Sequence, residues 1–66
     1  MTRGEIDAYI GRRAKVLRAD GVIHIGRIEK DSVARIRIVG KRFGHSIQYQ
    51  HILQIQAVSD SVPDTD

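Results

Sequence analysis

Hydrophobic positions follow a helical period only near the N-terminus. Ile6, Tyr9 and Ile10 have the i, i+3, i+4 spacing of an amphipathic helix, and acidic residues lie early in this stretch, as they do at helix N-termini. Gly11 then provides a typical stop signal. The pattern predicts one short helix within residues 2–10.

Beyond the helix, apolar and polar residues alternate as they do in β-strands. Asp20-Gly21 is a strong hairpin signal, and a second turn is expected at Asp31-Ser32. A loop is expected at residues 40–45. The predicted strands cover residues 13–19, 22–30, 35–39, 46–49 and about 52–58.

The apolar composition favours β-structure over helix. The chain has ten Ile and six Val but only two Leu, and β-branched side chains fit a pleated sheet better than a helix. Five short strands with a single short helix as cover do not make a stable flat sheet. We therefore expect a small all-β protein that folds as a strongly bent antiparallel barrel.

The length of 66 residues allows one small domain, which we place at residues 1–58. Residues 59–66 are polar and acidic and contain Pro63, so this tail is expected to be disordered. The chain has no Cys and no apolar run long enough for a membrane span or a signal peptide, which predicts a cytoplasmic protein. Self-association is the expected compensation for so small a core.

Charge is distributed unevenly along the sequence. Of the 8 acidic residues, Asp60, Asp64 and Asp66 lie in the tail, which contains no Lys or Arg, so the body carries 11 − 5 = +6. A basic body indicates an anionic partner, most often nucleic acid. Its cations form two groups whose guanidinium groups suit phosphate: Arg12, Arg13, Lys15 and Arg18, and then Arg35, Arg37, Lys41 and Arg42.

No catalytic or cofactor-binding pattern accompanies these cations. The three His residues have no third ligand nearby in sequence, and no Ser lies in a Gly-flanked nucleophile turn. The segment from Gly40 to Gly44 lacks the spacing of a phosphate-binding loop and is better interpreted as a basic hairpin tip. We expect no enzyme, no metal, no cofactor and no small-molecule substrate.

Two stretches resemble the Sm-like (LSm/Hfq-like) RNA-binding family. The stretch from Gly11-Arg12-Arg13 through the Asp20-Gly21 turn to Gly26-Arg27-Ile28 is similar to the first Sm motif, with matching intervals. Residues 47–55 are similar to the second motif. Two registers of that motif stay open: one aligns its Arg-Gly with Gln48-Tyr49, and the other matches Tyr49-Gln50-His51 to the Tyr-Lys-His of the bacterial branch.

The resemblance implies an Sm-like fold, in which a short N-terminal α-helix precedes a five-stranded SH3-like barrel. It also implies a closed homo-oligomeric ring in which the fourth strand pairs with the fifth strand of the next subunit. Closed head-to-tail assembly of such a domain suggests about five to seven subunits. The apolar residues on these two outer strands are expected either to need such a partner or to be core residues only; they are Ile47, Ile52, Ile55 and Val58.

Single-stranded RNA is the partner implied by the resemblance. Pore loops would carry Asp31, Arg35, Tyr49, Gln50 and His51, with Arg35 on phosphate, Tyr49 or His51 stacked on a base, and Gln50 on base edges. A lateral rim would carry Arg12, Arg13 and Lys15.

The sequence departs from the family pattern at two places. Arg35 replaces the base-reading Asn, and Arg18 and His24 stand where apolar residues are expected, so that they either line one mouth of the barrel or a bulge turns Leu17 and Ile25 inward. The predicted function is an RNA chaperone or scaffold. The alternative is a protein-interaction module that binds no RNA.

Overall fold

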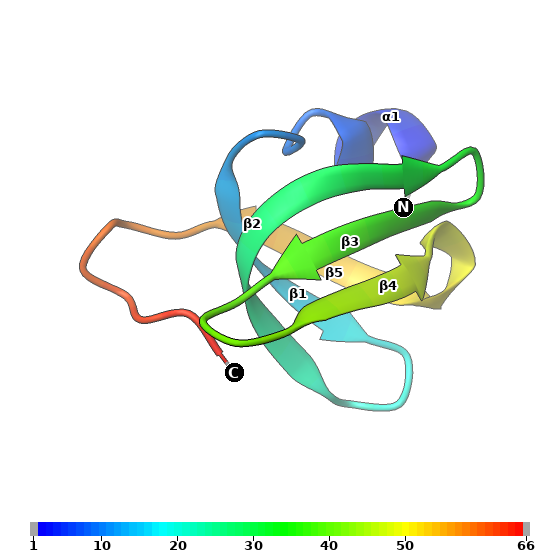
Figure 1. The fold of residues 1–66 in the computed structure, drawn as a ribbon. Helices are drawn as coiled ribbons and strands as arrows, with labels where there is room; N and C mark the ends of the chain where they lie inside the picture. Colours follow the sequence, from blue (N-terminus) through cyan, green and yellow to red (C-terminus); the bar gives the residue numbers. More distant parts are fainter. Residues whose placement is uncertain (1, 66) are drawn as a thin grey trace.

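The computed structural model describes residues 2–65 and contains one antiparallel five-stranded sheet with little helix (Figure 1). The all-β prediction is confirmed. The strands lie in the order β4-β3-β2-β1-β5. Their bounds are β1 Arg13–Arg18, β2 Ile23–Ser32, β3 Arg35–Val39, β4 Gly44–Gln48 and β5 Ile52–Ala57, with the 3₁₀ helix η1 at Tyr49–His51. None of the described helices is both long and apolar enough to cross a membrane.

Helix α1 (Arg3–Asp7) is shorter than its hydrophobic pattern predicts. Thr2 caps it, since the Thr2 hydroxyl accepts the Glu5 N–H at 3.2 Å. Ile6 is the helix's buried residue and anchors it on the sheet. After Asp7 the chain continues in turns and reaches β1 through Gly11, whose φ of 88° suits a glycine.

The first hairpin turns where the sequence predicts. Gly21 has φ 89°, and the Asp20 carboxylate accepts the Val22 N–H at 3.1 Å. The second turn differs from the prediction, because β2 continues through Asp31-Ser32 and the chain reverses at residues 33–34. The β2–β3 register shifts between residues 30 and 32, which absorbs the difference.

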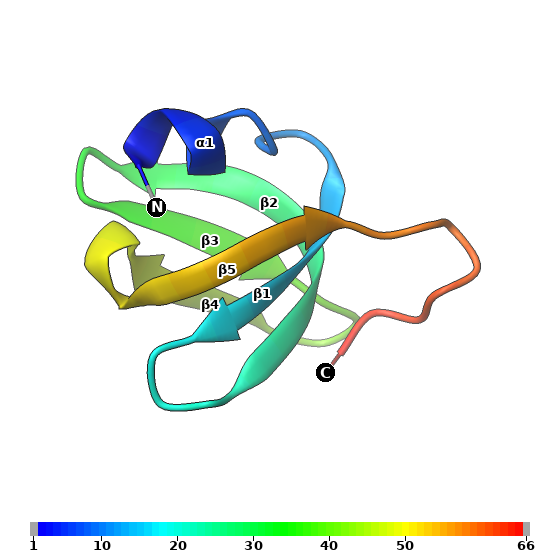
Figure 2. The same ribbon diagram turned by 180° about the vertical axis from the view of Figure 1, so that it is seen from behind.

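Strand β2 is long and curved, and it carries the bend of the whole sheet (Figures 1 and 2). Gly26 permits this curvature, since a Cβ at that position would lie 2.3 Å from the Val39 carbonyl oxygen of β3. The sheet nevertheless does not close. Strands β4 and β5 are its two edges, as predicted, and are not paired with each other, so the predicted strongly bent barrel is an open, bent sheet.

The concave side of the sheet holds an isoleucine-rich core. Its largest fully buried side chains are Ile6, Val16, Ile28, Ile36 and Ile38. The edge strands contribute to the same core, because Ile47, Ile52 and Ile55 are each at most 6% exposed. Of the two alternatives, these three side chains therefore belong to the chain's own core; among the described residues, Leu53 is the large apolar side chain exposed on an edge strand.

His24 lies at one end of this core. It is 6% exposed, and its ring stacks on His45 of β4 at a centroid distance of 4.3 Å. Arg18 is half-buried beside it, with its Nη1 3.4 Å from the His24 Nε2. Burial, followed by the nearby His45 and Arg18, lowers the pKa of His24, although Asp20 acts in the opposite direction. Of the two sequence alternatives, Arg18 and His24 thus line one mouth of the sheet.

Candidate nucleic-acid interface

The β2–β3 turn and η1 lie side by side, although they are far apart in sequence. The Tyr49 N–H donates to the Ala34 carbonyl oxygen at 3.1 Å, and Arg35 pairs with Gln48 in the β3–β4 ladder. The fold thus brings the predicted site residues Arg35, Tyr49 and Gln50 to one end of the sheet.

An open cleft of about 470 Å³ lies at this junction, and we call it the η1 cleft. Gln48 and Gln50 form one wall, and the Gln50 Nε2 donates to the Gln48 Oε1 at 2.7 Å. Each amide keeps further donor and acceptor positions, which are the groups that read base edges. The lining residues are Arg3, Ala34, Gln48, Tyr49 and Gln50.

Tyr49 forms the floor of the cleft and is itself locked in place. It is 7% exposed; its hydroxyl donates to the Asp7 carboxylate and accepts from the Lys30 Nζ at 2.7 Å. The Arg3 guanidinium carbon and the Lys30 Nζ lie 5.1 and 5.0 Å from the ring centroid. The expectation that Tyr49 itself stacks on a base does not fit this burial, because α1 and Lys30 occupy its surroundings.

The same contacts change the properties of Lys30. Its hydrogen bond to the Tyr49 hydroxyl, together with the attraction of Asp7, raises the pKa of Lys30 above its ordinary value. Lys30 therefore stays charged and holds Tyr49 and Asp7 together. No sequence pattern indicates this cluster, because its members come from α1, β2 and η1.

Arg35 has a different environment. It is exposed, and within residues 2–65 its guanidinium forms no hydrogen bond or ion pair. Its sequence neighbour Ala34 and its ladder partner Gln48 both line the η1 cleft, so Arg35 begins β3 directly beside it. A free guanidinium next to two amides is an arrangement suited to phosphate and base contacts.

Two other predicted pore residues do not join the η1 cleft. Asp31 accepts a hydrogen bond from the Ser46 hydroxyl at 2.6 Å and lies 3.6 Å from the Arg37 guanidinium, so it ties β2 to β3 and β4. His51 faces the other side of η1, where it lines a separate cleft of about 200 Å³ with Arg18, Ala19 and Asp20. The residues that the sequence predicts as one pore cluster therefore lie at three separate places.

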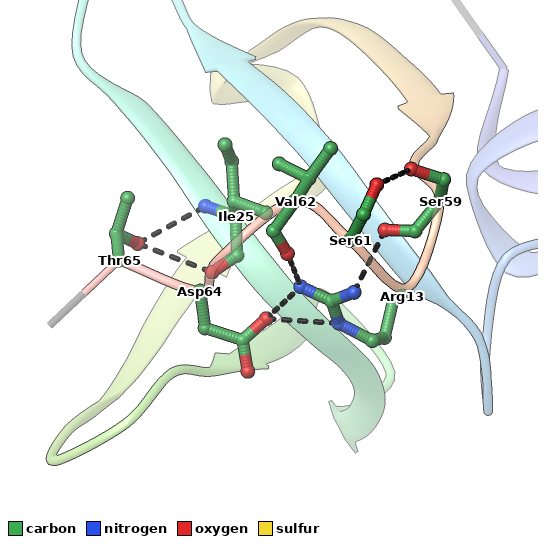
Figure 3. Close-up of polar contacts among 7 residues, drawn as sticks. All are labelled: Arg13, Ile25, Ser59, Ser61, Val62, Asp64 and Thr65. Carbon is green, nitrogen blue, oxygen red and sulfur yellow. Dashed lines mark hydrogen bonds and ion pairs between the residues drawn. The ribbon is translucent and has the colours of Figure 1, made fainter.

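The predicted lateral rim is also divided. Arg12 is exposed, with its guanidinium 5.6 Å from the Tyr9 ring centroid, and Lys15 lies on β1 between Ile25 and Gln56. Arg13, by contrast, is occupied. Its guanidinium donates to the Asp64 carboxylate and to the carbonyl oxygens of Ser59 and Val62 (Figure 3).

Residues 59–65 thus form a strap that folds back onto the sheet, in place of the disordered tail predicted from composition. Strand β3 ends opposite Arg27, which leaves the next stretch of β2 without a neighbour on that side. Thr65 fills the position. Its N–H donates to the Ile25 carbonyl oxygen at 2.9 Å. Its hydroxyl, drawn in Figure 3, accepts the Ile25 N–H at 3.0 Å. The strap therefore satisfies backbone groups that β3 is too short to reach.

Sequence reasoning missed Arg3, Ala34 and Gln48 as lining residues of the η1 cleft. Ala34 and Gln48 carry no signal of their own, because they enter through the strand register. No protein-family model matches the chain, and no significant match is found among curated proteins or solved structures.

Proposed function

We propose that this chain is a non-catalytic Sm-like protein that binds single-stranded RNA and assembles into a homo-oligomeric ring. The η1 cleft is the observation on which the proposal depends. There the β2–β3 turn and η1 meet, with Arg35 free for phosphate and Gln48 and Gln50 available to base edges. The body's charge of 11 − 5 = +6 is consistent with a polyanionic ligand.

Ring assembly is supported by the backbone rather than by side-chain burial. Strand β4 has 5 residues and β5 has 6, and both are open edges of the same sheet. Pairing β4 of one subunit with β5 of the next satisfies both edges, and a head-to-tail contact either closes or propagates. A ring of about five to seven subunits would repeat the η1 cleft around its centre.

The first test measures RNA binding by fluorescence anisotropy, with labelled hexauridylate as the probe. We expect affinity to fall steeply with salt, because phosphate contacts release counterions. Arg35→Ala should weaken binding, whereas Arg27→Ala, which removes an exposed arginine from β2, should change it much less. Equal losses in the two variants would remove the η1 cleft as the site.

A native mass measurement tests the assembly. A monomer at all concentrations would contradict the ring.

If the protein bound acidic proteins but neither hexauridylate nor a long polyuridylate, the chain would be an interaction module and the RNA proposal would be wrong.

A further inference from the structure

The β3–β4 loop lies at the opposite end of its hairpin from the η1 cleft (Figure 1). We call residues 40–43 the basic loop. Strand β3 has 5 residues, so at about 3.3 Å per residue the two places are roughly 15 Å apart along it. The basic loop belongs to neither the η1 cleft nor the predicted lateral rim.

The basic loop exposes an aromatic ring beside two cations. Phe43 is 58% exposed although it is the chain's single Phe, and large apolar side chains are normally withdrawn from water. Lys41 and Arg42 precede it directly and are exposed, and within residues 2–65 neither side chain is in an ion pair. An open ring flanked by unpaired cations matches a ligand with flat faces and negative charge.

Phe43 is also the outer member of a row of rings. Its centroid lies 6.5 Å from that of His45, and the His45 ring stacks on His24 at 4.3 Å. The row starts at the surface and ends at the buried His24. Phe43 is thus supported from behind by the sheet, and its outer side remains open.

The loop's backbone is fixed in place before any ligand arrives. The Gly40 N–H donates to the Phe43 carbonyl oxygen at 2.9 Å, and the Lys41 N–H donates to the Thr65 carbonyl oxygen of the strap at 3.2 Å. The strap packs so closely that a Cβ on Gly40 would lie 1.9 Å from that oxygen. A fixed loop loses little conformational entropy on binding, which favours it as a contact surface.

We propose that the basic loop is a second contact for single-stranded nucleic acid, with a base stacked on Phe43 and phosphates on Lys41 and Arg42. The inference rests on the proposed function for the identity of the ligand as RNA, but it uses a separate surface. A strand that occupies the η1 cleft would have to extend along the β3–β4 hairpin to reach the loop. The loop is therefore reached by strands of several nucleotides and not by a dinucleotide.

An anionic membrane is the competing partner for an aromatic residue between cations. The basic loop presents one aromatic side chain and no amphipathic helix, which is little apolar area for insertion into the bilayer interface. The same ring is large enough to stack on a base, and the adjoining cations are placed for its phosphates. These observations favour nucleic acid.

Phe43→Trp provides a direct reporter, since the chain contains no other tryptophan. We expect a long polyuridylate to quench its fluorescence by stacking. The control is Ile10→Trp, which places the single tryptophan at an exposed position after α1 and should not be quenched. Vesicles of equimolar phosphatidylserine and phosphatidylcholine are tested in parallel and should leave both variants unchanged.

Phe43→Ala completes the test by anisotropy. It should lower affinity for long polyuridylate about tenfold, the scale of one lost base stack, and leave binding of the dinucleotide diuridylate unchanged. The inference is overturned if long polyuridylate binds with neither quenching nor this loss, or if only the vesicles alter the fluorescence.

The two proposals fail in different ways. If Phe43→Ala loses affinity and Arg35→Ala does not, the η1 cleft is wrong and the basic loop stands. If Arg35→Ala alone loses affinity, the basic loop is wrong and the cleft stands. An unmodified chain that binds neither RNA overturns both.

Discussion

The two ends of the β3–β4 hairpin are organised in opposite ways. At the η1 end, α1 packs over Tyr49 through Arg3 and Asp7, yet an open cleft remains and Arg35 stays free. At the basic-loop end, the strap occupies the groove beside β2 and takes up the guanidinium of Arg13. The N-terminal segment contributes to the lining of a cleft, whereas the C-terminal strap occupies the free position beside β2. Sequence position therefore does not reveal which cations are available to a ligand.

The largest expected difference between the two ends concerns their aromatic residues. Tyr49→Ala should lower the free energy of unfolding by about 3–5 kcal/mol, because it empties a buried, hydrogen-bonded position. Phe43→Ala is the matched exposed aromatic and should stay within about 0.5 kcal/mol of the unmodified chain. Urea unfolding of both variants measures this. Similar losses would show that the two ends are equally packed.

The strap should contribute less than Tyr49 but more than a disordered tail. Gly40→Ala places a Cβ against the Thr65 carbonyl oxygen and should cost about 1–2 kcal/mol of stability by displacing the strap. In a chain that stops after Val58, the same substitution should cost less than about 0.5 kcal/mol. Thermal unfolding of the four proteins gives this double-mutant cycle. An undiminished cost in the shortened chain would show that Gly40 acts without the strap.

The arginines at the two ends should differ in RNA binding. Arg35→Ala should cost about 1–3 kcal/mol of binding free energy for hexauridylate, the scale of a charge-assisted contact. Arg13→Ala should cost less than about 0.5 kcal/mol, because Asp64 and the strap carbonyls already occupy Arg13. Anisotropy titrations at one fixed salt concentration compare them. A larger loss for Arg13→Ala would mean that RNA displaces the strap.

The smallest expected effect is a pH dependence at the mouth of the sheet. The pKa of His24 is lowered in the folded chain by burial, His45 and Arg18, so below the ordinary pKa of 6.5 the unfolded chain binds the proton more readily. The contribution of His24 is full above that pKa and declines as pH falls toward the lower folded-state pKa. Urea unfolding at several pH values should show this decline and a flatter profile for His24→Gln. His51→Gln, which replaces an exposed histidine, should keep the slope, and an unchanged slope in His24→Gln would contradict the assignment.

Local chemistry accounts for what the sequence predicted of the fold. Asp20-Gly21 turns because the glycine adopts positive φ and the aspartate accepts a backbone N–H, and both properties belong to the two residues themselves. Asp31-Ser32 has equally good turn chemistry but remains in β2. There the Asp31 carboxylate is engaged by Ser46 and Arg37 across the sheet, and no local pattern reveals such partners.

Prediction of the candidate site had the same limit, because sequence patterns report local chemistry and not contacts with distant residues. The resemblance pointed to Arg35 and Gln50, and the fold places Gln50 in the lining of the η1 cleft and Arg35 beside it. It did not reveal that Tyr49 is buried under α1, nor that Arg13 is held by Asp64, 51 residues away in sequence. Composition made residues 59–66 appear disordered, because three carboxylates and a proline suggest solvation. A few specific backbone bonds to Ile25 place Thr65 on the sheet instead.

Gly26 influences the angle between neighbouring subunits of the proposed ring. Because its backbone approaches Val39 too closely for any Cβ, it fixes how sharply β2 curves. That curvature determines the angle between the outward directions of the β4 and β5 edges. In the proposed ring, this angle is the rotation that relates one subunit to the next. A side chain at position 26 would force β2 and β3 apart and change this angle, and with it the number of subunits in the proposed ring.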